Sequence, residues 1–165
     1  MKTLLLLRHA KSSRKHLGVT DHDRLLNARG ERDALRVGRV IEAEAVRPDI
    51  ILSSTARRAW FTAKVISDAL SLPGKDMVLD NRLYLAEPAE IVDVVREVGN
   101  DARCVLVVGH NPGLEVLVMQ LTGHEESLPT AALAVVRLSM DSWRSLELRV
   151  MGQLERVCCP RERSL

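Results

Sequence analysis

The chain of 165 residues is 46% hydrophobic and 28% charged, which fits one globular domain of ordinary size. Its 24 Lys and Arg against 22 Asp and Glu leave a net charge of +2, too balanced to argue for nucleic acid or a membrane surface as the main partner. Two Trp, one Tyr and one Phe offer no platform on which bases could stack, so a nucleic-acid-binding protein is disfavoured.

Neither a membrane span nor a leader segment is predicted. The longest early apolar stretch, residues 4–7, is far shorter than a transmembrane helix. The three cysteines, Cys104, Cys158 and Cys159, have neither CxxC nor metal-ligand spacing, which favours reduced thiols. We therefore expect a cytoplasmic protein, whose oligomeric state the sequence does not predict.

The first half of the chain alternates strands with helices. A continuous apolar run such as residues 3–7 is typical of a central strand covered on both faces. The elements predicted from apolar spacing are a strand at 3–7, a helix at 28–45 with Asn27 as N-cap, a strand at 49–53, a helix at 56–70 capped by Ser54 or Thr55, and a short strand at 77–79.

The alternation continues in the second half. The predicted elements are a helix opening at Pro88, a buried strand at 104–108, a helix with Asn111 as N-cap and Pro112 as first residue, and a strand pair at 131–138 and 145–150. Residues 151–165 form a tail without an assignment. Because no repeat or linker divides the chain, we predict a single domain over 1–165. Its class is a three-layer α/β sandwich, with a mostly parallel central sheet and helices on both faces.

Cationic and titratable side chains follow three of the predicted strands. Arg8 and His9 follow the first, and Arg58 lies in the first turn of the helix after the second. His110 follows the strand at 104–108 and precedes a helix. Taken alone, each of these residues is more often a surface charge or a capping group than a functional residue. The carboxyl ends of parallel strands, however, lie at one edge of the sheet, so all four residues are expected there together. Helix N-termini there add free N–H groups, so we predict a phosphate site.

The stretch LLLLRHAKS resembles the Arg-His signature of the histidine phosphatase (phosphoglycerate mutase-like) superfamily. DRLLNARGERDA, SSTARRAWFTA and VVGHNPGLE resemble three further motifs in the same order, and GHNPG is typical of the SixA-like phosphohistidine phosphatase branch. Leu25, Thr55 and Phe61 depart from the residues usual in these motifs. The resemblance runs over about residues 1–150 and implies a phosphoglycerate mutase-like fold.

The chemistry of the four residues agrees with that resemblance. A neutral His9 can attack a phosphoryl group and become a transient phosphohistidine, while Arg8, Arg58 and His110 surround the phosphoryl oxygens. We expect no metal and no cofactor, because no ligand spacing is present. Lys11, Ser12 and Asn111 are further candidates for substrate binding. The alternative for Lys11 and Ser12 is a solvated turn, and the alternative for Asn111 is a helix cap.

The leaving group separates two substrate classes. A phosphomonoester needs an acid for its alkoxide, and the short connection before Ile91 offers Asp80, Glu87 and Glu90. Glu87 is the best placed of these, but just before Pro88 it also suits a helix N-cap. Imidazole, with a pKa of about 6.5, leaves without strong acid help.

The compact chain also has no segment that would enclose a small sugar. We therefore favour phosphohistidine on a partner signalling protein as the substrate. The alternatives are a phosphatase for a small phosphorylated metabolite and a non-catalytic module that binds phosphate or a phosphoprotein.

Overall fold

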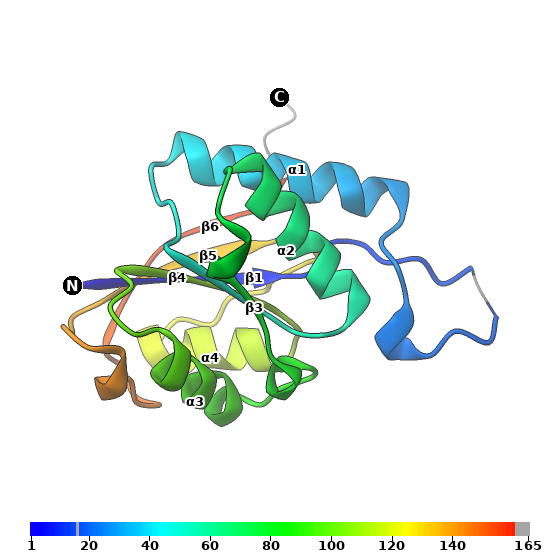
Figure 1. Cartoon of the computed structure of the whole chain (residues 1–165). Coiled ribbons are helices and arrows are strands. Elements are labelled where there is room, and N and C mark those ends of the chain that lie inside the picture. The colour runs from blue at the N-terminus through cyan, green and yellow to red at the C-terminus, as the bar shows by residue number, and fades with distance from the viewer. Residues whose placement is uncertain (16, 161–165) are drawn as a thin grey trace.

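The structure, a computed structural model, describes residues 1–15 and 17–160 and arranges them in three layers (Figure 1). The strands are β1 (Lys2–Arg8), β2 (Ile50–Ser53), β3 (Met77–Leu79), β4 (Cys104–Gly109), β5 (Leu133–Leu138) and β6 (Gly152–Cys158). The α-helices are α1 (Ala28–Ala43), α2 (Arg57–Ala69), α3 (Pro88–Val98) and α4 (Gly113–Thr122).

The strands form one sheet in the order β3-β2-β4-β1-β5-β6. The first four are joined by parallel pairings, whereas β5 runs antiparallel to both of its neighbours. Helices α1 and α2 cover one face of this sheet, and α3 and α4 cover the other (Figure 1). The predicted α/β three-layer fold is confirmed, although β5 makes the sheet mixed.

The leucines of β1 show how both faces are filled. Leu4 and Leu6 pack in the core beneath α3 and α4. Leu5 and Leu7 pack in the core beneath α1 and α2, because successive side chains of a strand point to opposite faces. All four are fully buried, and burial of each contributes about 1.5–3 kcal/mol. Strand β1 therefore holds its carboxyl end, with Arg8, in a fixed place.

The prediction of a strand at 145–150 is wrong. The partner of β5 is instead β6, which lies in the segment that had no assignment. The alternation of Leu146, Leu148 and Val150 suggested a strand, but Leu148 and Val150 are 40% and 60% exposed. Strand β6 is an edge strand with polar residues among its apolar ones, so its own sequence pattern is weak.

The helix caps predicted for α1 and α2 have different outcomes. The Asn27 side chain accepts from the Gly30 N–H at 2.8 Å and caps α1, as predicted. Helix α2 has Ala56 at its N-cap, so the cap predicted at Ser54 or Thr55 is wrong. The Ser54 hydroxyl instead accepts from the Ala56 N–H at 3.1 Å, one step outside the helix.

Helix α4 begins one residue later than predicted, with Pro112 at the N-cap and Gly113 as the first helical residue. The predicted cap, Asn111, uses its amide for other contacts. Its Nδ2 donates to the Glu115 carboxylate and to the Leu128 carbonyl, both at 2.8 Å. The side chain therefore ties the loop before β5 to α4.

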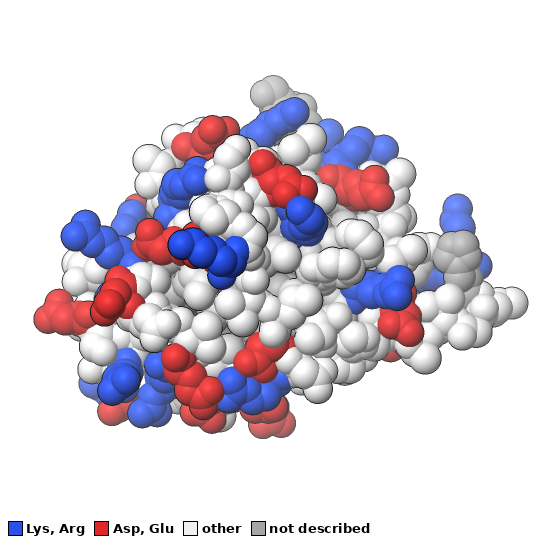
Figure 2. All heavy atoms as spheres, in the orientation of Figure 1, with Lys and Arg blue, Asp and Glu red and all other residues white. Residues whose placement is uncertain are grey.

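Basic and acidic side chains are interspersed over the face seen in Figure 2. Within residues 1–15 and 17–160, none of the helices has the length and apolar character that a membrane crossing requires.

Candidate active site

The predicted convergence of side chains is present at the carboxyl ends of β1, β2 and β4. Arg8 pairs with Gly109 across β1 and β4, so the next residues, His9 and His110, lie side by side. Their ring centroids are 5.3 Å apart. Arg58, in the first turn of α2, reaches both rings. The structure thus brings together all four residues of the predicted phosphate site.

His9 is held in one tautomer. Its Nδ1 lies 2.8 Å from the Ala10 carbonyl, which only accepts hydrogen bonds, so Nδ1 carries the proton. The lone pair of Nε2 consequently faces Arg58, whose Nε lies at 3.3 Å. Burial, followed by the charges of Arg58 and Arg8, lowers the pKa of His9 to about 4. The ring is therefore neutral at neutral pH, and its Nε2 electron pair accepts a hydrogen bond from Arg58 Nε.

Arg58 is 2% exposed, and every nitrogen of its guanidinium has a partner. Its Nη1 donates to the Asp21 carbonyl at 2.6 Å, and its Nη2 donates to the Asp21 carboxylate at 3.0 Å. The same Nη2 lies 3.4 Å from Nδ1 of His110. Thr62, one turn along α2, donates to the Arg58 carbonyl and accepts from the Ala10 N–H, which joins α2 to the loop after β1.

His110 lies opposite His9 and is 4% exposed. Its Nε2 is 2.8 Å from the Ser54 hydroxyl, and the Tyr84 ring packs edge-on against it with centroids 5.5 Å apart. Burial, then the neighbouring His9 and Arg58, lowers the pKa of His110 to about 3. Like His9, this ring is neutral at neutral pH.

Arg8 is anchored by the loop that precedes β5. Its Nη1 donates to the Leu128 carbonyl at 3.2 Å, and Leu128 is itself fixed by its N–H bond to the Glu115 carboxylate at 2.9 Å. Both Nδ2 bonds of Asn111 lead to these same two residues. The Nδ2 of Asn111 therefore holds the loop that positions Arg8, and the substrate-binding role of Asn111 stays a prediction.

Lys11 and Ser12 are not brought into contact with His9 in the part of the chain that the structure describes. The exposed Lys11 lines a cavity of about 450 Å³ together with Arg8 and Arg29. Ser12 is buried, and its backbone forms a bridge with Leu26. Their role in substrate binding stays a prediction.

Two site residues were missed by sequence reasoning, Asp21 and Tyr84. Asp21 lies in a 3₁₀ turn (Asp21–Asp23) that folds over Arg58, and the Tyr84 hydroxyl donates to its Oδ2 at 2.5 Å. This bond, followed by those of Arg58, lowers the pKa of Asp21 to about 2. Tyr84 is the single Tyr of the chain, but no local pattern ties it to a residue 63 positions earlier.

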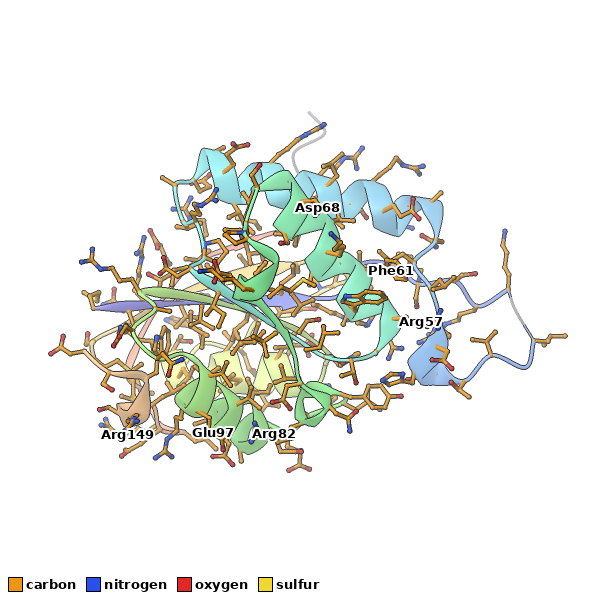
Figure 3. The ribbon with its side chains drawn as sticks, in the orientation of Figure 1. Arg57, Phe61, Asp68, Arg82, Glu97 and Arg149 are labelled. Atoms are coloured by element: carbon orange, nitrogen blue, oxygen red, sulfur yellow. The ribbon has the colours of Figure 1, made fainter. Side chains whose placement is uncertain are left out.

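Glu87 and Arg57, the neighbour of Arg58 that lies one position off the motif, lie outside this cluster. Arg57 is exposed on α2, where Figure 3 shows it one turn before Phe61, and its Nε is 3.8 Å from Asp23. Glu87 occupies the N-cap of α3 and forms a capping box with Glu90. Over residues 1–15 and 17–160, no group of three or more His, Cys, Asp or Glu side chains could hold a metal ion.

A family model described as histidine phosphatase superfamily (branch 1) matches residues 4–84, which include Arg8, His9 and Arg58. The uncharacterized protein Rv1276c of Mycobacterium tuberculosis is 32% identical over 152 residues, 86% of this chain and 92% of that protein. The chain belongs to the histidine phosphatase superfamily. As a member, it is a phosphatase, and the predicted recognition is confirmed.

Solved structures place this histidine phosphatase beside SixA. A candidate phosphohistidine phosphatase SixA from Agrobacterium tumefaciens superposes with a TM-score of 0.81 at 28% identity, over 96% of this chain and 98% of the other. A second, from Nakamurella multipartita, gives 0.82 at 27% identity over 97% and 96%. A SixA complexed with tungstate shares the fold at 21% identity, with a TM-score of 0.82 over 97% and 98%.

Proposed function

We propose that this phosphatase works through a phosphohistidine intermediate on His9 and removes phosphate from phosphohistidine on a partner protein. The observation that carries the proposal is the neutral His9, whose Nε2 lone pair faces a pocket made by two arginines and a second neutral histidine. The likeness to SixA structures at 27–28% identity supports the same substrate class.

The first chemical step follows from the tautomer of His9. The Nε2 electron pair forms a bond to phosphorus while the bond from phosphorus to the leaving group breaks in line with it. The Ala10 carbonyl accepts the hydrogen bond from the protonated Nδ1 and so fixes the ring during attack. Water then cleaves the phosphohistidine and regenerates neutral His9.

The arginines would stabilise charge on the transferred group. In this proposal Arg8 and Arg58 bind the phosphoryl oxygens, where charge spreads in a loose transition state, and His110 completes the pocket. Arg suits this role because its planar fork matches phosphate oxygens and keeps its proton. Since two fixed cations supply the positive charge, we propose that turnover needs no metal.

The leaving group favours phosphohistidine over an alkyl phosphate. Glu87 is engaged at the start of α3, and Asp21, beside Arg58, is ionised at neutral pH. The ionised Asp21 has no proton to give an alkoxide, and the Glu87 carboxylate is used in the capping box, whereas imidazole departs without acid help. A phosphohistidine-bearing signalling protein in the cytoplasm is the partner that we propose.

A leaving-group series tests this proposal. We expect phosphoimidazole and p-nitrophenyl phosphate to be cleaved well and an alkyl phosphate to be cleaved about 10²–10⁴-fold more slowly, the usual contribution of acid catalysis. The rates should be unchanged after exhaustive chelation. An alkyl phosphate cleaved as fast as phosphoimidazole would favour a small-metabolite phosphatase, and a rate restored only by added metal would contradict the metal-free mechanism.

A further inference from the structure

A cavity of about 450 Å³ at the carboxyl end of β1 is lined by three cations, Arg8, Lys11 and Arg29. The rest of its wall comes from the loop before β5, which includes Thr130, and from the segment after β6, which includes Pro160. None of the described residues that line the cavity is acidic. An anion that enters it would therefore meet three positive charges and no negative one.

The walls of this cavity are formed by close neighbours of His9. Arg8 directly precedes His9 in the chain, and Lys11 follows it by two positions. In the loop before β5, the Ala131 N–H donates to the His9 carbonyl at 3.1 Å, and the adjacent Thr130 lines the cavity. A protein surface that presents a phosphorylated side chain to His9 therefore also reaches the edge of this cavity.

Other cations near the active site have carboxylate partners within the chain. Arg24 and Arg58 each pair with Asp21 at 3.0 Å, and Arg57 lies 3.8 Å from Asp23. The positive charges around this turn are therefore balanced by the protein itself.

Two cations of the cavity, Lys11 and Arg29, are not balanced in this way. The Lys11 side chain forms no hydrogen bond or ion pair in the described part of the chain. Arg29 lies 4.0 Å from Asp33, whose carboxylate is closer to Arg36, at 3.2 Å. Arg29 is also the second residue of α1, where the helix dipole disfavours a cation. Pairing and helix stability thus give little reason for a cation at either position.

Resting on the proposed function, we propose that this cavity is a carboxylate-binding subsite for the partner protein. It receives an acidic side chain that lies within a few residues of the phosphohistidine. Lys11 and Arg29 donate charge-assisted hydrogen bonds to that carboxylate. Arg8 borders both the cavity and the phosphate site, so its charge attracts both anionic groups of the substrate. The phosphatase thereby distinguishes one phosphohistidine from another by the residues beside it.

The experiment uses pairs of phosphohistidine peptides that differ in one residue, glutamate or glutamine, placed in turn at each position within about three residues of the phosphohistidine. For wild type we expect at least one position at which glutamate raises kcat/KM about 10-fold over glutamine, the usual effect of one charge-assisted hydrogen bond. The preference should weaken as the salt concentration rises, because the cavity is open to solvent.

Two variants test whether the cavity causes this preference. In Lys11→Met and in Arg29→Met the ratio of kcat/KM for the glutamate peptide to that for the glutamine peptide should fall below about threefold, because one donor to the carboxylate is lost. The ratio corrects for any change in fold or in the phosphate site, since such a change lowers both rates together. Arg39→Met is the matched control, because Arg39 is an exposed cation on the same helix that does not line the cavity. It should keep the wild-type ratio.

Three results would overturn the inference: no preference for glutamate at any position in wild type, a preference that survives in Arg29→Met, or an equal decrease in Arg39→Met. The last would assign the preference to the net charge of the protein rather than to the cavity. All three leave the proposed function intact, because the glutamine peptides would still be dephosphorylated. The proposed function fails separately if wild type cleaves the phosphohistidine peptides no faster than an alkyl phosphate.

Discussion

Arg57 and Arg58 are sequence neighbours in opposite environments. Arg58 is 2% exposed and contacts both active-site histidines, whereas the Arg57 side chain is 53% exposed and reaches only toward Asp23 among the ion pairs described. Successive residues of a helix are about 100° apart, so only one of the two can face the sheet edge. The difference provides a matched pair for testing the phosphate site.

We predict that Arg58→Ala lowers kcat/KM for phosphoimidazole by at least about 10²–10³-fold, the cost of one preorganised donor to developing charge. Arg57→Ala should change it less than about threefold, because exposed ion pairs contribute little. Steady-state kinetics on both variants, with thermal unfolding to verify the fold, make the comparison. Equal losses in the two variants would remove Arg58 from the phosphate site.

Site residues that lie directly at the ends of strands could be predicted from the sequence. Arg8, His9 and His110 stand at strand ends, where parallel topology alone brings them together. Asp21 and Tyr84 could not be found in this way, because their contact joins two loops that share no sequence pattern.

At the scale of single elements, the start of α3 decides what Glu87 does. Glu87 is the N-cap, Pro88 is the first helical residue, and the Glu87 N–H donates to the Glu90 carboxylate at 3.1 Å. A capping box satisfies backbone donors that the helix leaves without partners. Glu87 is thus committed to the helix by the same sequence features that made it a candidate acid.

We expect Glu87→Gln to leave the rates on all phosphorylated probes within about threefold of wild type, because Gln can also accept at an N-terminus. Glu87→Ala should lower the free energy of unfolding by about 1 kcal/mol, the usual cost of losing a cap. Urea titration measures the second effect and kinetics the first. A selective loss of alkyl phosphate hydrolysis in Glu87→Gln would identify Glu87 as a general acid.

Element prediction succeeded where burial was continuous and failed at the edge formed by β6, although the short strand predicted at 77–79 is the opposite edge strand, β3. Strands β1 and β4 are buried on both faces, and their apolar runs identify them. The edge strand β6 carries Glu155 and Arg156 among its apolar residues, and its position depends on pairing with β5. Which of the segments 145–150 and 152–158 forms the strand beside β5 is decided by tertiary pairing, which local composition does not encode.

At the scale of the whole molecule, the two buried histidines link the active site to stability. The pKa values of His9 and His110 are lowered to about 4 and about 3, from about 6.5 in an unfolded chain. Between these values the unfolded state binds more protons than the native state. The free energy of unfolding therefore falls as the pH drops below about 6.5, and this contribution is fully present above it.

We predict that wild type loses stability steadily between about pH 6.5 and 4.5, and that His110→Gln shows a shallower slope because one of the two shifted groups is gone. Urea unfolding at a series of pH values measures both slopes. Identical slopes in the two proteins would show that the His110 pKa is not depressed in the native state.

The central claim is that His9 carries the phosphoryl group during turnover. Rapid acid-free quenching of wild type with radioactively labelled phosphoimidazole, followed by peptide mapping, tests it most directly. The account predicts an acid-labile label on His9, and in His9→Ala no label and no turnover, with the fold and phosphate binding retained. A label on another residue, or turnover that survives His9→Ala, would contradict it.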